Sequence, residues 1–290
     1  MPYYGNPCTI LTNCNDEIKV KEKAFSVSTN KKVLFAKGNL QYQASTKTWR
    51  FAENQWDYIG DANHNISDTY SGWIDLFGWG TGKQPTNTST YYEDYQTYID
   101  WGENIIGTDK PNIWRTLSAN EWRYIFCLRP NAKELWGFAS VNGINGIIIL
   151  PDNGTSINIP FVSSIDEGLA EQPIDNEIIN FNFQFENNIY DIVDYSIADW
   201  TKIEQAGAVF LPVTCCRHAK EVDGLNYGYY WSSTPLDDGS AFMLGFNDTI
   251  GLGSGSMDGD GRVYAFSVRL VRYSVHLETQ FWGYIFAPCQ

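Results

Sequence analysis

Two strong helix-start signals lie about eighty residues apart, and they restrict what this chain can fold into. Ser118-Ala119-Asn120-Glu121 is a capping box, in which the serine oxygen accepts a backbone N–H and the glutamate reaches back to the cap. A second helix is predicted to begin at Ser196, with Asp199 three residues on, and to end at Gly207. Short strand-like runs surround both helices. This pattern favours the α+β class, with two helices packed on a mainly antiparallel sheet between long irregular loops.

The apolar runs outside the helices are short and predict strands. Residues 139–150 read as a hairpin around Asn142-Gly143 and Asn145-Gly146. Three stretches predict loops: residues 56–110, packed by their own aromatic rings, an acidic insertion or surface loop at 163–194, and a glycine-rich turn at 251–261. The expected strands cover residues 33–36, 39–42, 49–52, 147–150, 208–211, 228–233, 241–246, 264–271 and 275–285.

The chain of 290 residues is interpreted as one domain with two extensions. We expect an N-terminal arm at 1–24, the domain at 25–272 and a C-terminal extension at 273–290. The start lacks the regions of a signal peptide. The chain is therefore expected to be either a mature secreted protein whose signal was removed or a protein that does not use that route. No run of about 18 apolar residues predicts a membrane span.

The net charge and the aromatic content restrict the classes of ligand that we expect this chain to bind. The formal net charge of −14 disfavours nucleic acid, because an acidic field repels phosphates. Aromatic residues make up 16% of the chain, including 11 Trp and 18 Tyr, whose rings suit either an irregular core or sites for sugars and proteins. The six cysteines form no C-x-x-C pair, and the sequence leaves their disulfide pairing open. They are Cys8, Cys14, Cys127, Cys215, Cys216 and Cys289.

Five segments together resemble a large family of surface proteins from gut anaerobes. The segments are Gly38–Tyr42, Ser71–Gly80, Trp200–Pro212, Gly228–Thr234 and Ser267–Arg272. The family is the major paralogous domain type. Its resemblance implies a C-type-lectin-like fold of the formylglycine-generating-enzyme (sulfatase-modifying factor) subtype. Members are mostly surface or secreted binding proteins.

The resemblance does not carry the enzyme chemistry of that subtype. The segment that holds the reactive cysteines of the enzymes is not found here. The chain also has Cys215-Cys216-Arg217 where the family has a Gly-Tyr-Arg-like stretch, and residues 273–290 extend past the family pattern.

The usual sequence motifs of catalytic and metal sites are not found, so the sequence gives little support to an enzymatic function. The three histidines lie outside H-E-x-x-H, and no G-x-S-x-G elbow is present. Cys215 or Cys216 beside His218 is the nearest candidate for catalysis. Asp258-Gly259-Asp260-Gly261 begins like a calcium loop, but Arg262 replaces an oxygen ligand. We therefore expect no catalytic residues, no metal site and no cofactor, with calcium in oxygen-rich loops left as the open alternative.

The sequence thus favours a non-enzymatic ligand-binding or adhesion module, extracellular or at a cell surface. Its ligand would be a glycan or a protein, held by loops at 226–230, 236–240 and 248–262. The alternatives are a structural or receptor-binding component of a phage virion or fimbria, and an enzyme of unknown class. A homo-oligomer or assembly into a larger particle stays open, and packing is the favoured role for Trp231. The candidate ligand-binding residues are Tyr229, Tyr230, Trp231, Asp237, Asp238, Asn247, Asp248, Asp258 and Asp260.

Overall fold

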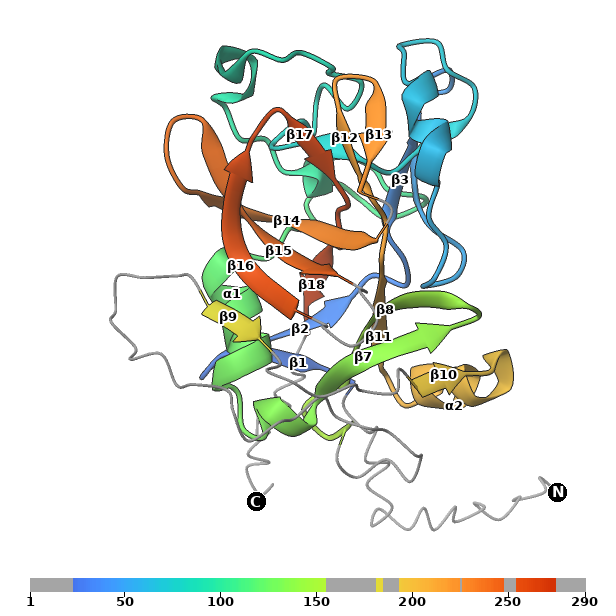
Figure 1. Cartoon of the computed structure of the whole chain (residues 1–290), viewed down its shortest axis with the longest axis vertical. Helices are drawn as coiled ribbons and strands as arrows, with labels where there is room; N and C mark the ends of the chain where they lie inside the picture. Colours follow the sequence, from blue (N-terminus) through green and yellow to red (C-terminus); the bar gives the residue numbers. More distant parts are fainter. Residues whose placement is uncertain (1–22, 155–180, 185–192, 225, 248–253, 275–290) are drawn as a thin grey trace, which may run out of the picture.

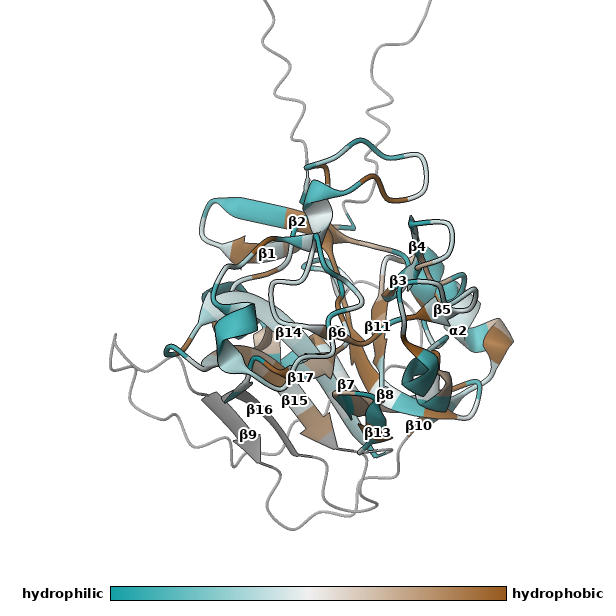
Figure 2. Ribbon diagram, turned by 90° about the horizontal axis from the view of Figure 1, so that it is seen from above, coloured by the Kyte–Doolittle hydropathy of each residue, from teal (hydrophilic) through white to brown (hydrophobic). Residues whose placement is uncertain are grey.

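The computed structural model describes residues 23–154, 181–184, 193–224, 226–247 and 254–274, and it has the expected α+β class (Figure 1). Within these residues, two α-helices and several short 3₁₀ turns accompany five small sheets, whose strands pair mostly antiparallel. Figure 2 shows the apolar residues gathered on inner strands such as β11 (Val209–Pro212), with hydrophilic residues on the outer loops. The C-type-lectin-like subtype stays a prediction.

The longest sheet is antiparallel and has the order β14-β15-β16-β9. Its strands are β14 (Tyr227–Pro235), β15 (Ser240–Asn247), β16 (Ser254–Gly261) and β9 (Phe181–Gln184). Two loop predictions are wrong here. Most of the glycine-rich run forms β16, and the expected insertion contributes β9 and the short strand β10 (Val193–Tyr195). Glycine occurs in strands where another backbone approaches closely, so the glycine-rich run was also compatible with a strand.

A smaller sheet, β13-β12-β17-β6, lies at one end of the molecule (Figure 1). It consists of β12 (Cys216–His218), β13 (Glu221–Asp223), β17 (Tyr264–Phe266) and β6 (Phe77–Gly78). The expected strand at 264–271 is therefore divided. Its first part is β17, and the chain then leaves to form β18 (Val271–Tyr273) in another sheet. The strand expected at 275–285 lies outside the described residues.

The hairpin and the second helix form as predicted. β7 (Trp136–Val141) and β8 (Ile144–Ile149) are joined by Asn142 and Gly143, whose φ values of 54° and 75° suit a tight primed turn. Asn145-Gly146 lies within β8 instead. Ser196 caps α2 (Ile197–Gln205) by accepting the Asp199 N–H, and Gly207 follows with a φ of 102°. This sheet has the order β10-β7-β8-β11.

The remaining sheets hold the N-terminal part of the domain. One has the order β1-β2-β18 and the other β4-β3-β5. Their strands are β1 (Phe25–Ser28), β2 (Lys31–Phe35), β3 (Leu40–Gln43), β4 (Thr48–Phe51) and β5 (Trp73–Ile74).

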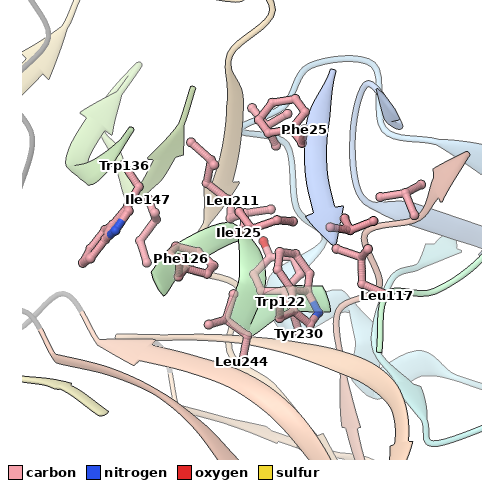
Figure 3. Close-up of a cluster of buried hydrophobic side chains, with 14 of the residues drawn as sticks. Phe25, Leu117, Trp122, Ile125, Phe126, Trp136, Ile147, Leu211, Tyr230 and Leu244 are labelled. Atoms are coloured by element: carbon pink, nitrogen blue, oxygen red, sulfur yellow. The ribbon is translucent and has the colours of Figure 1, made fainter. Parts of the chain in front are cut away.

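The first helix packs at the centre of the largest apolar cluster. α1 (Ala119–Arg123) has both hydrogen bonds of the predicted capping box and continues as a π-helical turn, η4 (Tyr124–Leu128). Its Trp122, Ile125 and Phe126 meet Leu211, from the sheet that holds β8, and Leu244, from the long sheet (Figure 3). Burial of so many large side chains is the main stabilising contribution at this junction.

Candidate functional site

A ladder of stacked rings runs from the surface into the domain. Tyr227 and Tyr229 lie two residues apart on β14, so both side chains point to the same side of the sheet, and their rings are parallel with centroids 5.5 Å apart. Tyr229 stacks in turn on Phe266 of β17 at 4.8 Å. Tyr264 lies 6.3 Å from Phe266, and His218 lies 5.0 Å from Tyr264. We call these five residues the tyrosine ladder.

Strand pairing builds the ladder from distant parts of the chain. β12 pairs antiparallel with β17, and this register sets His218 directly opposite Tyr264. Ser267, just after β17, donates its backbone N–H to the Tyr229 carbonyl at 3.0 Å and accepts the Trp231 N–H at 3.1 Å. Backbone hydrogen bonds therefore fix the positions of the rings.

Exposure falls along the ladder from its ends to its middle. Tyr227 is 40% exposed, and the His218 side chain at the other end is also exposed. Tyr229 and Tyr264 are half-buried, whereas Phe266 is buried and packs on Trp231 at 4.4 Å. Four rings of the ladder are thus partly or largely exposed, and they stand on a buried base. Such preformed rings can bind a ligand at low entropic cost.

Two carboxylates accompany the rings. Burial raises the pKa of Tyr229, and the nearby charges of Asp260 and Asp223 raise it further. The same two carboxylates act on Cys216, whose pKa is raised to about 11, chiefly by burial. Asp223 is exposed and Asp260 half-buried, and the Asp260 carboxylate also accepts the Gly261 N–H at 2.7 Å. Asp223 and Asp260 therefore lie close enough to Tyr229 and Cys216 for their charges to act on both groups.

Of the predicted site residues, Tyr229 is one of the ladder rings, and the charge of Asp260 is among the causes that raise its pKa, after burial. Tyr230 and Trp231, in contrast, are 0% and 1% exposed. The Tyr230 hydroxyl donates to the Pro212 carbonyl at 2.8 Å, and the Trp231 indole donates to the Phe77 carbonyl at 2.7 Å. Both side chains are enclosed in the core, which favours a packing role over ligand contact for these two predicted residues.

Asp237 and Asp238 shape the turn between β14 and β15. The Asp237 carboxylate accepts the backbone N–H groups of Gly239 at 2.8 Å and Ser240 at 2.7 Å, and the first of these is the largest cause of its lowered pKa. The Asp238 carbonyl accepts from the Gln96 amide at 2.7 Å. Both side chains are exposed, and the structure shows them organising a loop end.

The other three predicted residues do not form a described loop. Asn247 ends β15 opposite Tyr227, and Asp258 lies within β16 opposite Met243. Asp248 lies outside the described residues. Placing 254–261 in a loop is therefore wrong, since these residues form a strand.

Sequence reasoning missed five members of this surface, and a sequence signal existed for three of them. Tyr227 with Tyr229, and Tyr264 with Phe266, are aromatic pairs at i and i+2, the spacing of one face of a strand. His218 and Asp223 carry no such signal, because only the pairing of β12 with β13 and β17 brings them here.

The nearest catalytic candidates have properties that disfavour nucleophilic chemistry. Cys215 is buried, and its pKa is raised to about 12, first by burial and then by the charge of Asp75. With Cys216 also raised, both thiols stay protonated at neutral pH, whereas the thiolate is the reactive form. Among the described residues, no group of three or more His, Cys, Asp or Glu side chains could hold a metal ion.

Comparison of the chain with protein-family models, curated proteins and solved structures finds no match. The resemblance to the C-type-lectin-like family therefore stays a prediction. In the part of the chain that the structure describes, no helix has the length and apolar character to cross a membrane.

Proposed function

We propose that this protein is a non-enzymatic ligand-binding module that binds a carbohydrate on its tyrosine ladder, at a cell or particle surface. The observation that carries the proposal is the set of partly exposed rings Tyr227, Tyr229 and Tyr264, held on the buried ring of Phe266. Ring faces pack against the C–H faces of sugar rings, and carboxylates accept hydrogen bonds from sugar hydroxyls. A surface of this kind offers both contacts at once.

The ladder suits a chain of sugar units better than a small molecule in a pocket. Its rings follow one another over three centroid separations of 5.5, 4.8 and 6.3 Å, from Tyr227 to Tyr264. Because Phe266 in the middle is buried, successive units of an oligosaccharide would contact the two ends of the ladder, Tyr227 with Tyr229 and Tyr264 with His218. The net charge of −14 disfavours polyphosphates and nucleic acids as ligands of the same surface.

The finer fold assignment belongs to the same proposal. We infer a C-type-lectin-like fold from the five resembling segments, and the α+β architecture is consistent with it. Three of these segments contribute strands or helices next to the ladder: Ser71–Gly80 supplies β6, Gly228–Thr234 lies in β14, and Ser267–Arg272 follows β17. The virion or fimbrial alternative would use the same tyrosines to contact a protein.

A glycan array with matched tyrosine variants tests the proposal. We expect the protein to bind a set of array oligosaccharides and Tyr227→Ala to lose at least roughly tenfold in affinity, because an exposed ring is removed while the fold is kept. Tyr273→Ala is the control, since Tyr273 is 52% exposed and lies on β18 in another sheet.

Equal binding by both variants, or an array without signal, would contradict carbohydrate binding on the ladder. A pull-down in which Tyr227→Ala loses a protein partner would instead support the particle-component alternative. Circular dichroism of both variants checks that their folds are intact.

A further inference from the structure

A polar cavity lies at a second place on the molecule, outside the tyrosine ladder. It has a volume of about 650 Å³. Residues 83–89 form one wall, and Tyr42 and Lys47, from β3 and the turn after it, line another part. Asp68 completes the lining. The volume lies within the usual range for small-molecule sites.

The charge of this cavity is opposite to that of the chain as a whole. The residues that line it include two lysines, Lys47 and Lys83, and one aspartate, Asp68. The local balance is thus positive in a protein whose net charge is −14. The Asp68 carboxylate already accepts a hydrogen bond from the Thr86 hydroxyl, and its charge contributes to raising the pKa of Tyr42 after burial.

The Lys83 ammonium is held in place before any ligand arrives. It donates to the Glu103 carbonyl at 3.3 Å and to the Asn104 side-chain oxygen at 3.2 Å. The Asn104 amide is fixed in turn by the Gly82 carbonyl at 2.8 Å. Neither acceptor belongs to the residues that line the cavity, so the third N–H of the ammonium is the donor that an anion in the cavity would use.

The rest of the lining consists mainly of hydroxyl and amide side chains. Thr86, Thr88 and Ser89 supply hydroxyls, and Gln84 and Asn87 supply amides, with few apolar contacts between them. Such a lining provides little burial for an apolar side chain. It offers many hydrogen bonds to a molecule that carries several hydroxyl groups.

We propose that this cavity binds a sugar acid, that is, a sugar unit with one carboxylate, placed between Lys47 and Lys83. A phosphate is disfavoured, because its second negative charge would meet Asp68 and no guanidinium lines the cavity. A second acidic group on the ligand is disfavoured as well. The neighbouring cavity of about 210 Å³, which shares Lys83, is lined by Glu93 and Asp94.

Isothermal titration with glucuronate, galacturonate, glucose and glucose 6-phosphate tests this inference. We expect both uronates to bind roughly tenfold or more tightly than glucose, and more tightly than glucose 6-phosphate. Lys83→Gln and Lys47→Asn should each weaken uronate binding several-fold. Asparagine suits position 47, where φ is 53° and the left-handed conformation is required.

A gain-of-binding variant guards against simple misfolding. Asp68→Asn keeps an oxygen that accepts the Thr86 hydrogen bond, and it removes a negative charge that repels the carboxylate of the ligand. The affinity for uronates should therefore rise. Lys133→Gln, an exposed lysine on the 3₁₀ turn Ala132–Glu134, is the matched control and should leave binding unchanged.

Three results would overturn the inference: glucose binding as tightly as the uronates, no effect of either lysine variant on uronate binding, or no binding of any probe. The outcome is separable from that for the ladder, since Tyr227→Ala should leave uronate binding in the cavity intact.

Discussion

Two successive tyrosines on β14 show how one strand serves two different regions. Tyr230 points into the sealed cluster around α1, where it is 0% exposed and hydrogen-bonded to Pro212 and Asn39. Tyr229 points to the opposite side, where the rings lead outward to Tyr227 and the solvent. The residue type is the same, and the side of the sheet decides whether the ring stabilises the fold or is available to a ligand.

The sealed region also depends on a buried arginine. Arg269 is 1% exposed, and its guanidinium donates to the Asn39 side chain at 3.0 Å and to the Phe210 carbonyl at 2.8 Å. Further contacts join it to Ala36 and Gln55. Burial lowers its pKa to about 10, so it stays charged at neutral pH. This arginine thus donates to the Phe210 carbonyl of β11 and to the carbonyls of the buried residues Ala36 and Gln55.

Removing this hub should give the largest effect on stability. Arg269→Met is expected to lower the free energy of unfolding by about 4 kcal/mol or more, because several buried acceptors lose their donor at once. Urea unfolding followed by tryptophan fluorescence measures the change. Arg272→Met is the control. That arginine is exposed, stacks 5.3 Å from the Trp114 ring, and should contribute less than about 1 kcal/mol. Equal losses in both variants would refute the assignment of Arg269 to a sealed region.

The buried carboxylate of Asp75 gives a second test of the sealed region, because its contribution to the unfolding free energy depends on pH. Asp75 is 1% exposed and accepts hydrogen bonds from the Ile59 N–H at 2.8 Å and the Asn63 amide at 2.9 Å. Burial outweighs these bonds and raises its pKa from 3.8 to about 6. The folded state therefore binds this proton more tightly than the unfolded state. Stability should rise as the pH falls from 7 through 6 and level off near 4, by roughly 3 kcal/mol in total.

The variant Asp75→Asn isolates this contribution, since it cannot titrate. The difference in unfolding free energy between the wild type and Asp75→Asn should grow in favour of the wild type between pH 7 and pH 4. A constant difference would show that the Asp75 carboxyl is not buried in the way described.

Local structure could be predicted from the sequence better than the way in which the strands pair into sheets. Ser118, Ser196 and Asn142-Gly143 specified two helix starts and a hairpin, because capping and turn chemistry act within a few residues. The β16 strand was missed, since its glycines resemble a loop until a neighbouring strand pairs with them.

The candidate site was predictable only in part for the same reason. Tyr229 and Asp260 were among the predicted residues, and the i, i+2 spacing at Tyr227 and Tyr264 held a further signal. His218 forms one end of the ladder because β12 pairs with β17. This pairing joins segments about 45 residues apart in the sequence. Distinguishing Tyr229 from Tyr230 requires knowing which side of β14 is sealed, and this depends on the packing of α1.

Removing one hydroxyl from each tyrosine provides the finest test of that distinction. Tyr230→Phe should lower the unfolding free energy by about 1–2 kcal/mol, because the Pro212 carbonyl and the Asn39 amide lose a partner inside the core. Tyr229→Phe should change it by less than about 0.5 kcal/mol, since its ring contacts with Phe266 persist. Paired denaturation curves under identical conditions measure both values. If Tyr229→Phe proved the more costly change, the half-buried ring would be performing a structural role, and the ladder would have to be regarded as part of the core.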